Sequence, residues 1–194
     1  MSKGRLEAFS DGVLAIVITI MVLNLKTPRE PRLEALRPLI PEFMSYAFSF
    51  VFVGIYWANH HHLFQAVRHV NGPTLWANLH LLFWLSLTPF VTGWMGETGF
   101  ATWPVVAYGV VLLLSAVAYS ILVRVLIAQH GRDSALAAAV GSDRKGNLSL
   151  LIYAAALPAA FLDPRLSCAM YAVVALMWLV PDLRIERALN KKEP

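Results

Sequence analysis

The sequence predicts an all-α integral membrane protein, a bundle of six transmembrane helices forming a single domain over residues 1–194. Of these residues 58% are apolar and 14% are charged, whereas charged residues make up roughly 25% of an average soluble domain. The charged residues also cluster between long neutral stretches, and about 20 apolar residues suffice to cross a hydrocarbon core of about 30 Å. Six such stretches cover residues 12–25, 43–67, 69–96, 98–123, 146–162 and 166–181.

The first helix must begin before its neutral stretch. Residues 12–25 cover only about 21 Å at about 1.5 Å per residue, so the helix is predicted to begin near Lys3. It then carries Arg5, Glu7 and Asp11 toward the membrane. Charged groups at that depth need protein or water beside them.

Prolines and glycines mark the other boundaries. The four prolines between residues 26 and 42 favour a loop with short helical pieces, and residues 71–73, Asn-Gly-Pro, predict a tight turn. Pro89 and Pro158 fall inside the third and fifth spans, where the lost backbone hydrogen bond predicts a kink. The longest inner loop covers residues 129–147, within which residues 134–140 are able to form a helix.

The distribution of Lys and Arg predicts that both termini lie in the cytoplasm, and we expect a multi-pass protein of the plasma membrane. In this orientation eleven basic residues lie inside: Lys3, Arg5, Arg68, Arg124, Arg132, Arg144, Lys145, Arg184, Arg187, Lys191 and Lys192. Five lie outside: Lys26, Arg29, Arg32, Arg37 and Arg165. This bias accounts for the net charge of +4, and nothing in the sequence supports nucleic-acid binding.

Polar side chains from three helices lie at one depth. They are Arg5, Ser10 and Asp11; Trp57, Asn59, His60, His61 and His62; and Trp76, Asn78 and His80. Counting from the inner boundary places these sets about 9–12 Å deep, where an unpaired ionisable group costs about 2.5–3.5 kcal/mol. We expect a hydrogen-bonded network that ties the first helix to the second and third. The alternatives are histidines that cap carbonyls or face headgroups, and a solvent-facing inner mouth for Arg5 and Asp11.

No metal, cofactor or enzymatic site is predicted. Adjacent residues on a helix point about 100° apart, so His60, His61 and His62 cannot all bind one ion. The sequence has no His-Glu-x-x-His pattern, no cysteine pair and no Gly-x-Ser-x-Gly elbow. The single Cys168 is expected to pack as a small apolar residue.

The first helix carries a narrow stripe of side chains. At about 100° per residue and with Ile16 as zero, Leu23 lies near −20°, Ile20 near +40° and Thr19 near −60°. Asp11 lies near −140°, toward the histidines. The stripe is therefore apolar with one hydroxyl, a pattern typical of ordinary helix packing as well as of a pore.

Residues 5–11 fit the Arg-x-x-x-Phe-Ser-Asp signature of the transmembrane protein 175 family, with Phe9, Ser10 and Asp11 as its last three positions. This family comprises endosomal and lysosomal potassium channels and their bacterial relatives. Residues 56–61 resemble its second-helix Trp-x-Asn-His-His segment. Trp76, Asn78 and residues 88–92 are similar to its third helix. The single six-helix unit resembles the bacterial form.

The resemblance implies a homotetramer in the lipid bilayer, in which the first helix of each subunit lines a central pore for K⁺. Ile16 is then expected to form the tightest ring, Thr19 the next layer and Leu23 an outer ring, with Ile20 on the same stripe. The sequence has no Thr-Val-Gly-Tyr-Gly loop, which excludes a selectivity filter of backbone carbonyls. The expected function is a cation channel with weak to moderate K⁺ selectivity and a hydrophobic constriction.

A proton-coupled cation transporter is the second interpretation, because Asp11 and the histidines at positions 60–62 are the residue types of a proton relay. A membrane enzyme is the third, and it lacks a nucleophile or a metal shell. A channel and a transporter differ in whether K⁺ movement needs a pH gradient.

Overall fold

Every regular element in the described part of the chain is a helix. The computed structural model describes residues 2–67, 69–131, 134–140 and 143–179. The helices are α1 Lys3–Leu23, η1 Leu33–Leu39, α2 Ile40–Gln65, α3 Gly72–Ser86, α4 Thr88–Glu97, α5 Thr102–His130, α6 Ala135–Val140, α7 Arg144–Ala159 and α8 Pro164–Leu179. Six basic residues used to predict the orientation lie outside the described residues: Arg68, Arg132, Arg184, Arg187, Lys191 and Lys192.

The helix boundaries follow the predicted signals. The first helix begins at Lys3 as predicted. The third span breaks next to Pro89, where α3 ends and α4 begins after Leu87, which confirms the predicted kink. Asn71 caps α3 by accepting a hydrogen bond from the backbone N–H of Thr74. Pro158 instead lies one residue before the end of α7, so it bounds that helix and does not kink its middle.

Within the described residues, four segments are long and apolar enough to cross a membrane: α1, η1 with α2, α3 with α4, and α5. The helix α8 is apolar but shorter. At about 1.5 Å per residue, the 16 residues of α7 and the 16 of α8 each extend about 24 Å. The described part of the chain is thus all-helical, with four candidate spans.

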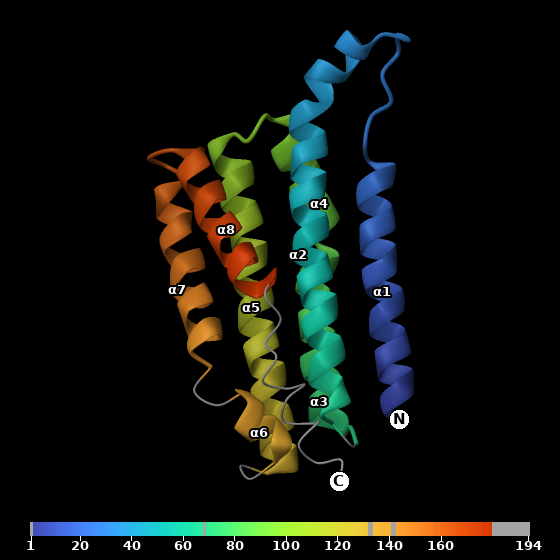
Figure 1. Cartoon of the computed structure of the whole chain (residues 1–194), viewed down its shortest axis with the longest axis vertical. Helices are drawn as coiled ribbons and strands as arrows, with labels where there is room; N and C mark the ends of the chain where they lie inside the picture. The colour runs from blue at the N-terminus through green and yellow to red at the C-terminus, as the bar shows by residue number, and fades with distance from the viewer. Residues whose placement is uncertain (1, 68, 132–133, 141–142, 180–194) are drawn as a thin grey trace.

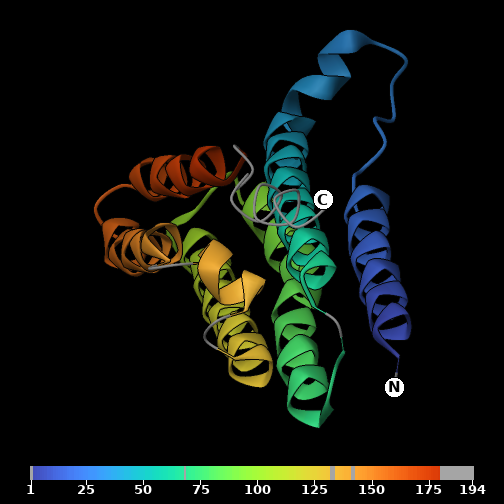
Figure 2. The same cartoon turned by 60° about the horizontal axis from the view of Figure 1, so that its bottom comes forward.

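Two apolar clusters hold the bundle together. One joins α1, α2, α3, α5 and α6, and the other joins α2, α4, α5, α7 and α8. Figures 1 and 2 show that α1 lies at one edge of the bundle and α7 at the other, with α2 to α5 between them. Among the described helices, only α2, α3 and α4 make extensive contacts with α1. One side of α1 is therefore left without a neighbour among the described helices.

Gly109 in α5 permits close packing of α8. The Tyr171 hydroxyl lies against Gly109 and donates a hydrogen bond of 3.2 Å to the Val105 carbonyl. A methyl group on Gly109 would also come within 2.7 Å of the Tyr171 ring carbon Cζ and 2.8 Å of Leu157. These are distances that packed carbon atoms do not tolerate.

Gly109→Ala is therefore expected to lower the free energy of unfolding by roughly 1–3 kcal/mol, because overpacking forces neighbouring side chains to shift. Thermal unfolding in detergent measures this loss. Gly54→Ala in α2 is the matched control, since a methyl group there would meet nothing within 4 Å. Equal stability of the two variants would contradict the packing argument.

Candidate pore-lining helix and its polar contacts

The predicted stripe on α1 faces away from the rest of the subunit. Ile16, Ile20 and Leu23 are 60%, 42% and 75% exposed, and Thr19 is exposed as well. The opposite face is buried and carries Leu6, Ser10, Leu14, Val17 and Met21. Since α2, α3 and α4 cover only this buried face, the described helices that pack on α1 leave the stripe uncovered.

Thr19 presents an oxygen on this free face. Its hydroxyl donates a hydrogen bond of 2.8 Å to the Ala15 carbonyl one turn earlier. A hydroxyl group has one donor hydrogen and two acceptor lone pairs. With the hydrogen used inside the helix, the lone pairs are left for a cation or a water molecule.

A buried hydrogen-bond chain joins α1 to α2 and α3. The Asn78 amide nitrogen donates to Ser10 Oγ at 3.0 Å, and Ser10 Oγ donates to the Leu6 carbonyl at 2.9 Å. His60 Nε2 lies 2.8 Å from Asn78 Oδ1. Because an amide oxygen only accepts, His60 donates here through Nε2. Ser10, Asn78 and His60 are all buried, so these hydrogen bonds fix both the depth and the rotation of α1.

A second set of polar contacts lies on the exposed side of the same helices. Trp57 Nε1 donates to Asp11 Oδ1 at 3.0 Å, and the Trp57 ring stacks on His61 with centroids 6.0 Å apart. His61 also shares a hydrogen bond with Gln65. This set ties α1 to α2 through a carboxylate that the subunit leaves uncovered.

The remaining polar residues do not join either set. No hydrogen bond or ion pair links Arg5 to another described residue, and Phe9 is exposed. Asn59 donates to the Ile55 carbonyl in its own helix. Trp76 is exposed on α3. His80 accepts a hydrogen bond from Trp84 one turn later, so the polar residues divide into two groups and do not form one continuous layer.

A further buried polar chain was not predicted. Ser49 Oγ lies 2.7 Å from Thr92 Oγ1 and 3.0 Å from the Tyr108 hydroxyl, and Thr92 Oγ1 lies 3.8 Å from the Met21 sulfur. It links α2, α4 and α5 to the second half of α1. In the sequence, the polar members of this group stand out only as single hydroxyl residues inside apolar spans.

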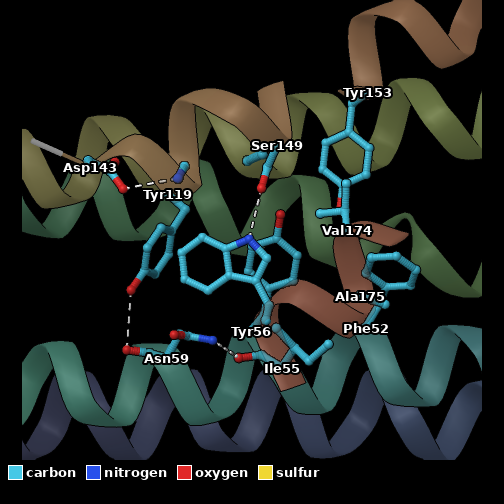
Figure 3. Close-up of a pocket in the computed structure, with 13 residues that line it drawn as sticks. Phe52, Ile55, Tyr56, Asn59, Tyr119, Asp143, Ser149, Tyr153, Val174 and Ala175 are labelled. Atoms are coloured by element: carbon cyan, nitrogen blue, oxygen red, sulfur yellow. Dashed lines mark hydrogen bonds between the residues drawn. The ribbon is translucent and has the colours of Figure 1, made fainter. Parts of the chain in front are cut away.

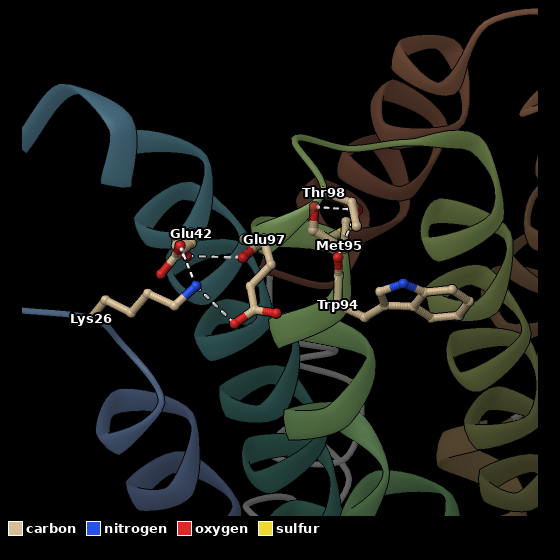
Figure 4. Close-up of polar contacts among 7 residues, drawn as sticks. Lys26, Glu42, Trp94, Met95, Glu97 and Thr98 are labelled. Atoms are coloured by element: carbon tan, nitrogen blue, oxygen red, sulfur yellow. Dashed lines mark hydrogen bonds and ion pairs between the residues drawn. The ribbon is translucent and has the colours of Figure 1, made fainter.

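Two ion pairs hold the segment after α1 against α2 and α4. Lys26 Nζ lies 2.9 Å from Glu97 Oε1 and 3.2 Å from Glu42 Oε1 (Figure 4). Hydrogen bonds to the Glu97 and Glu42 carboxylates raise the pKa of the Lys26 ammonium above its ordinary value. The charged form is thus favoured in the folded protein. The bonds of charged Lys26 therefore contribute to stability below the ordinary lysine pKa. This contribution is lost only as the pH rises through the raised pKa of Lys26.

An apolar cavity of about 50 Å³ lies elsewhere, between α2, α5, α7 and α8. Figure 3 shows the Tyr56 and Tyr153 rings beside it, together with Ser149, which accepts a hydrogen bond from Trp178 Nε1 at 2.9 Å. No residue of α1 lines this cavity, so it is not part of the stripe. Among the described residues, no group of three or more His, Cys, Asp or Glu side chains is placed to hold a metal ion.

Comparison with known proteins gives consistent matches. The profile of a family described as "Endosomal/lysosomal potassium channel TMEM175" matches residues 5–89. A protein of Chryseobacterium sp. (strain P1-3) named as a potassium channel is 53% identical over 191 residues, which are 98% of this chain and 100% of that relative. The human protein named as endosomal/lysosomal proton channel TMEM175 is 41% identical over 80 residues, 35% of this chain and 16% of the human one.

The fold has a solved counterpart. A lysosomal potassium-selective channel TMEM175 homologue from Chamaesiphon minutus superposes with a TM-score of 0.78 at 26% identity, covering 93% of this chain and 97% of that one. Together with the four apolar spans, this likeness defines a multi-pass helical membrane protein of an ion-channel class and not an enzyme. The chain belongs to the TMEM175 family. The resemblance indicated by residues 5–11 is thereby confirmed.

Proposed function

We propose that four copies of this chain form a cation channel with weak to moderate selectivity for K⁺, with α1 of each copy facing a central axis. The exposed stripe on α1 carries this proposal, because its apolar side chains and one hydroxyl lie on the side away from α2, α3 and α4. The bacterial relative named as a potassium channel, which this chain matches over its full length, supports the same assignment.

In this proposal the whole chain is one channel domain with six crossings, in which α7 and α8 add to the four longer spans. Both termini lie in the cytoplasm and the membrane is the plasma membrane. The start of α1 and the turn between α2 and α3 are then at the inner side. The loop after α1 is then at the outer side. In Figure 1 this loop lies at the opposite end of the bundle from the starts of α1 and α3.

Permeation then depends on dehydration. Four Ile16 side chains form the narrowest ring, followed by Thr19, Ile20 and Leu23 toward the outside. An apolar ring forces an ion to shed water, and this costs K⁺ less than the smaller, more tightly hydrated Na⁺. The Thr19 oxygens replace part of the lost hydration, since their lone pairs are free of the helix. Apolar rings also gate by dewetting.

The polar contacts have a structural role in this proposal. Ser10, His60 and Asn78 hold α1 in register from inside the subunit, while Asp11 and Trp57 hold it from the exposed side. His61 supports this exposed set by stacking on Trp57, and Asn59 bonds within its own helix. The other predicted members of the network are expected to contribute at surfaces that the assembly covers: Arg5, Phe9 and Trp76. None of these residues binds the permeating ion directly, and no metal or organic cofactor takes part.

Recording from the purified protein in planar bilayers under asymmetric K⁺ and Na⁺ tests this function. We expect a reversal potential displaced toward the K⁺ equilibrium potential, carried by an oligomer whose mass in detergent is that of four chains. A current that needs a pH gradient and collapses with it would instead support a proton-coupled transporter using Asp11 and the residues around His60–His62. Absence of any K⁺ current from a tetramer would refute the channel assignment.

A further inference from the structure

The last turn of α1 is weakly held by the subunit. Met21 is the last buried residue of the helix, and Val22, Leu23 and Asn24 after it are all exposed. A cavity of about 490 Å³ lies beside this turn, between α1, α2 and α4, and Met21 and Asn24 line it. Packing alone therefore leaves the end of α1, and Leu23 with it, free to shift.

The opposite wall of this cavity is closely packed. Gly96 of α4 packs so closely on α2 that a methyl group there would lie 2.8 Å from Glu42 Cα and even closer to the Ser45 hydroxyl. Ser45 Oγ in turn donates a hydrogen bond of 2.9 Å to the Glu42 carbonyl. The carboxylates of Glu42 and Glu97 consequently belong to two helix ends that pack directly on each other, the start of α2 and the end of α4, here called the platform.

Lys26 joins the loose end to the platform. It follows Leu23 by three residues, and its ammonium lies between the two carboxylates, 2.9 Å from Glu97 and 3.2 Å from Glu42 (Figure 4). The two acids come from opposite ends of different helices, the first turn of α2 and the last residue of α4. A single side chain thus ties α1 to both neighbours across the cavity.

We infer that Lys26 is a positioning residue for conduction, which holds the outer end of α1, and with it the Leu23 ring, against α2 and α4. This inference rests on the proposed channel function. The side chains of Lys26 and Glu97 are 56% and 55% exposed and that of Glu42 is 13% exposed. Exposed ion pairs are weak, so the tie restrains the helix end without being needed for folding.

Distances between subunits test the tie directly. In a Cys168→Ser background, a spin label at Leu23→Cys reports the spread of α1 ends across the tetramer. Lys26→Met should broaden this distribution and move it to longer distances, and Lys26→Arg should restore it. Arg29→Met is the matched control, because Arg29 is exposed, lies three residues further on and makes no ion pair with a described residue.

Selectivity provides a second readout. With Lys26→Met, the reversal potential under asymmetric K⁺ and Na⁺ should shift toward zero, because a loose Leu23 ring admits more hydrated ions. Combined Glu42→Gln and Glu97→Gln should give the same shift, and adding Lys26→Met to that pair should change nothing more, as expected for groups acting together.

The two proposals fail differently. A wild-type protein without K⁺ current, or a labelled protein with native Lys26 that shows no distances between subunits, refutes the channel itself. A conducting wild type whose Lys26→Met variant matches Arg29→Met in both distance distribution and reversal potential overturns the role of Lys26.

Discussion

Replacing Ile16 with Asn is expected to raise K⁺ current and to weaken discrimination between K⁺ and Na⁺. Ile16 is an exposed residue of the α1 stripe, at the position proposed for the narrowest ring. An amide in its place supplies oxygens to a passing ion and lets water wet the constriction. We expect the amide to lower the barrier to permeation by about 1.4 kcal/mol, which corresponds to about a tenfold larger current.

Planar-bilayer recordings under asymmetric K⁺ and Na⁺ measure both effects. Thr19→Val is the companion variant, because it keeps the shape of Thr19 and removes the oxygen, so K⁺ preference should fall. Val22→Asn is the matched control: Val22 is also exposed on α1, but about 120° from Ile16 around the helix. A tetrameric Ile16→Asn protein with unchanged current and reversal potential would place the stripe outside the conduction path.

The start of α1, the break before Pro89 and the common level of three polar residues could be predicted from the sequence because they depend on distances along the chain. The start of α1 at Lys3 follows from the length that a membrane requires. The break before Pro89 follows from a missing backbone donor. The shared depth of Ser10, His60 and Asn78 follows from the rise per residue, and the structure brings these three together.

Partners within that depth could not be predicted, because they depend on how neighbouring helices are rotated about their axes. Asp11 contacts Trp57 on the exposed side, while His60 turns inward to Asn78. Arg5 was expected in the same network, yet no described partner lies within bonding distance. A rotation of α2 or α3 is set by packing against α4 and α5, which no local pattern in the sequence records.

Long-range polar contacts were also missed, for a related reason. Ser49 and Thr92 are 43 residues apart, and Lys26 is 71 residues from Glu97. Single hydroxyl groups in apolar helices have no periodicity, and charged residues near a membrane boundary look alike whether paired or solvated. Only the fold brings Glu42 and Glu97 together at the Lys26 ammonium.

Asn78→Leu is expected to destabilise the protein by about 1–3 kcal/mol, because the buried donor of His60 loses its acceptor. Leucine has a similar size, and Ser10 keeps its bond to the Leu6 carbonyl, so the loss falls mainly on His60. Hydrogen bonds between helices in membrane proteins contribute about 0.6 kcal/mol each to stability on average, which favours the lower part of this range. Thermal unfolding in detergent measures the change.

Asn59→Leu is the matched control, since the Asn59 amide nitrogen donates only to Ile55 in its own helix. The combined variant His60→Leu with Asn78→Leu separates a hydrogen bond from simple packing. Removing both partners leaves nothing buried and unpaired, so the double variant should lose less stability than the sum of the two single losses. Additive losses, or an Asn78→Leu protein as stable as Asn59→Leu, would contradict this bond. Because the Asn78 amide nitrogen also donates to Ser10 and so fixes the rotation of α1, Asn78→Leu should also weaken K⁺ selectivity, an effect that a loss of packing far from α1 would not produce.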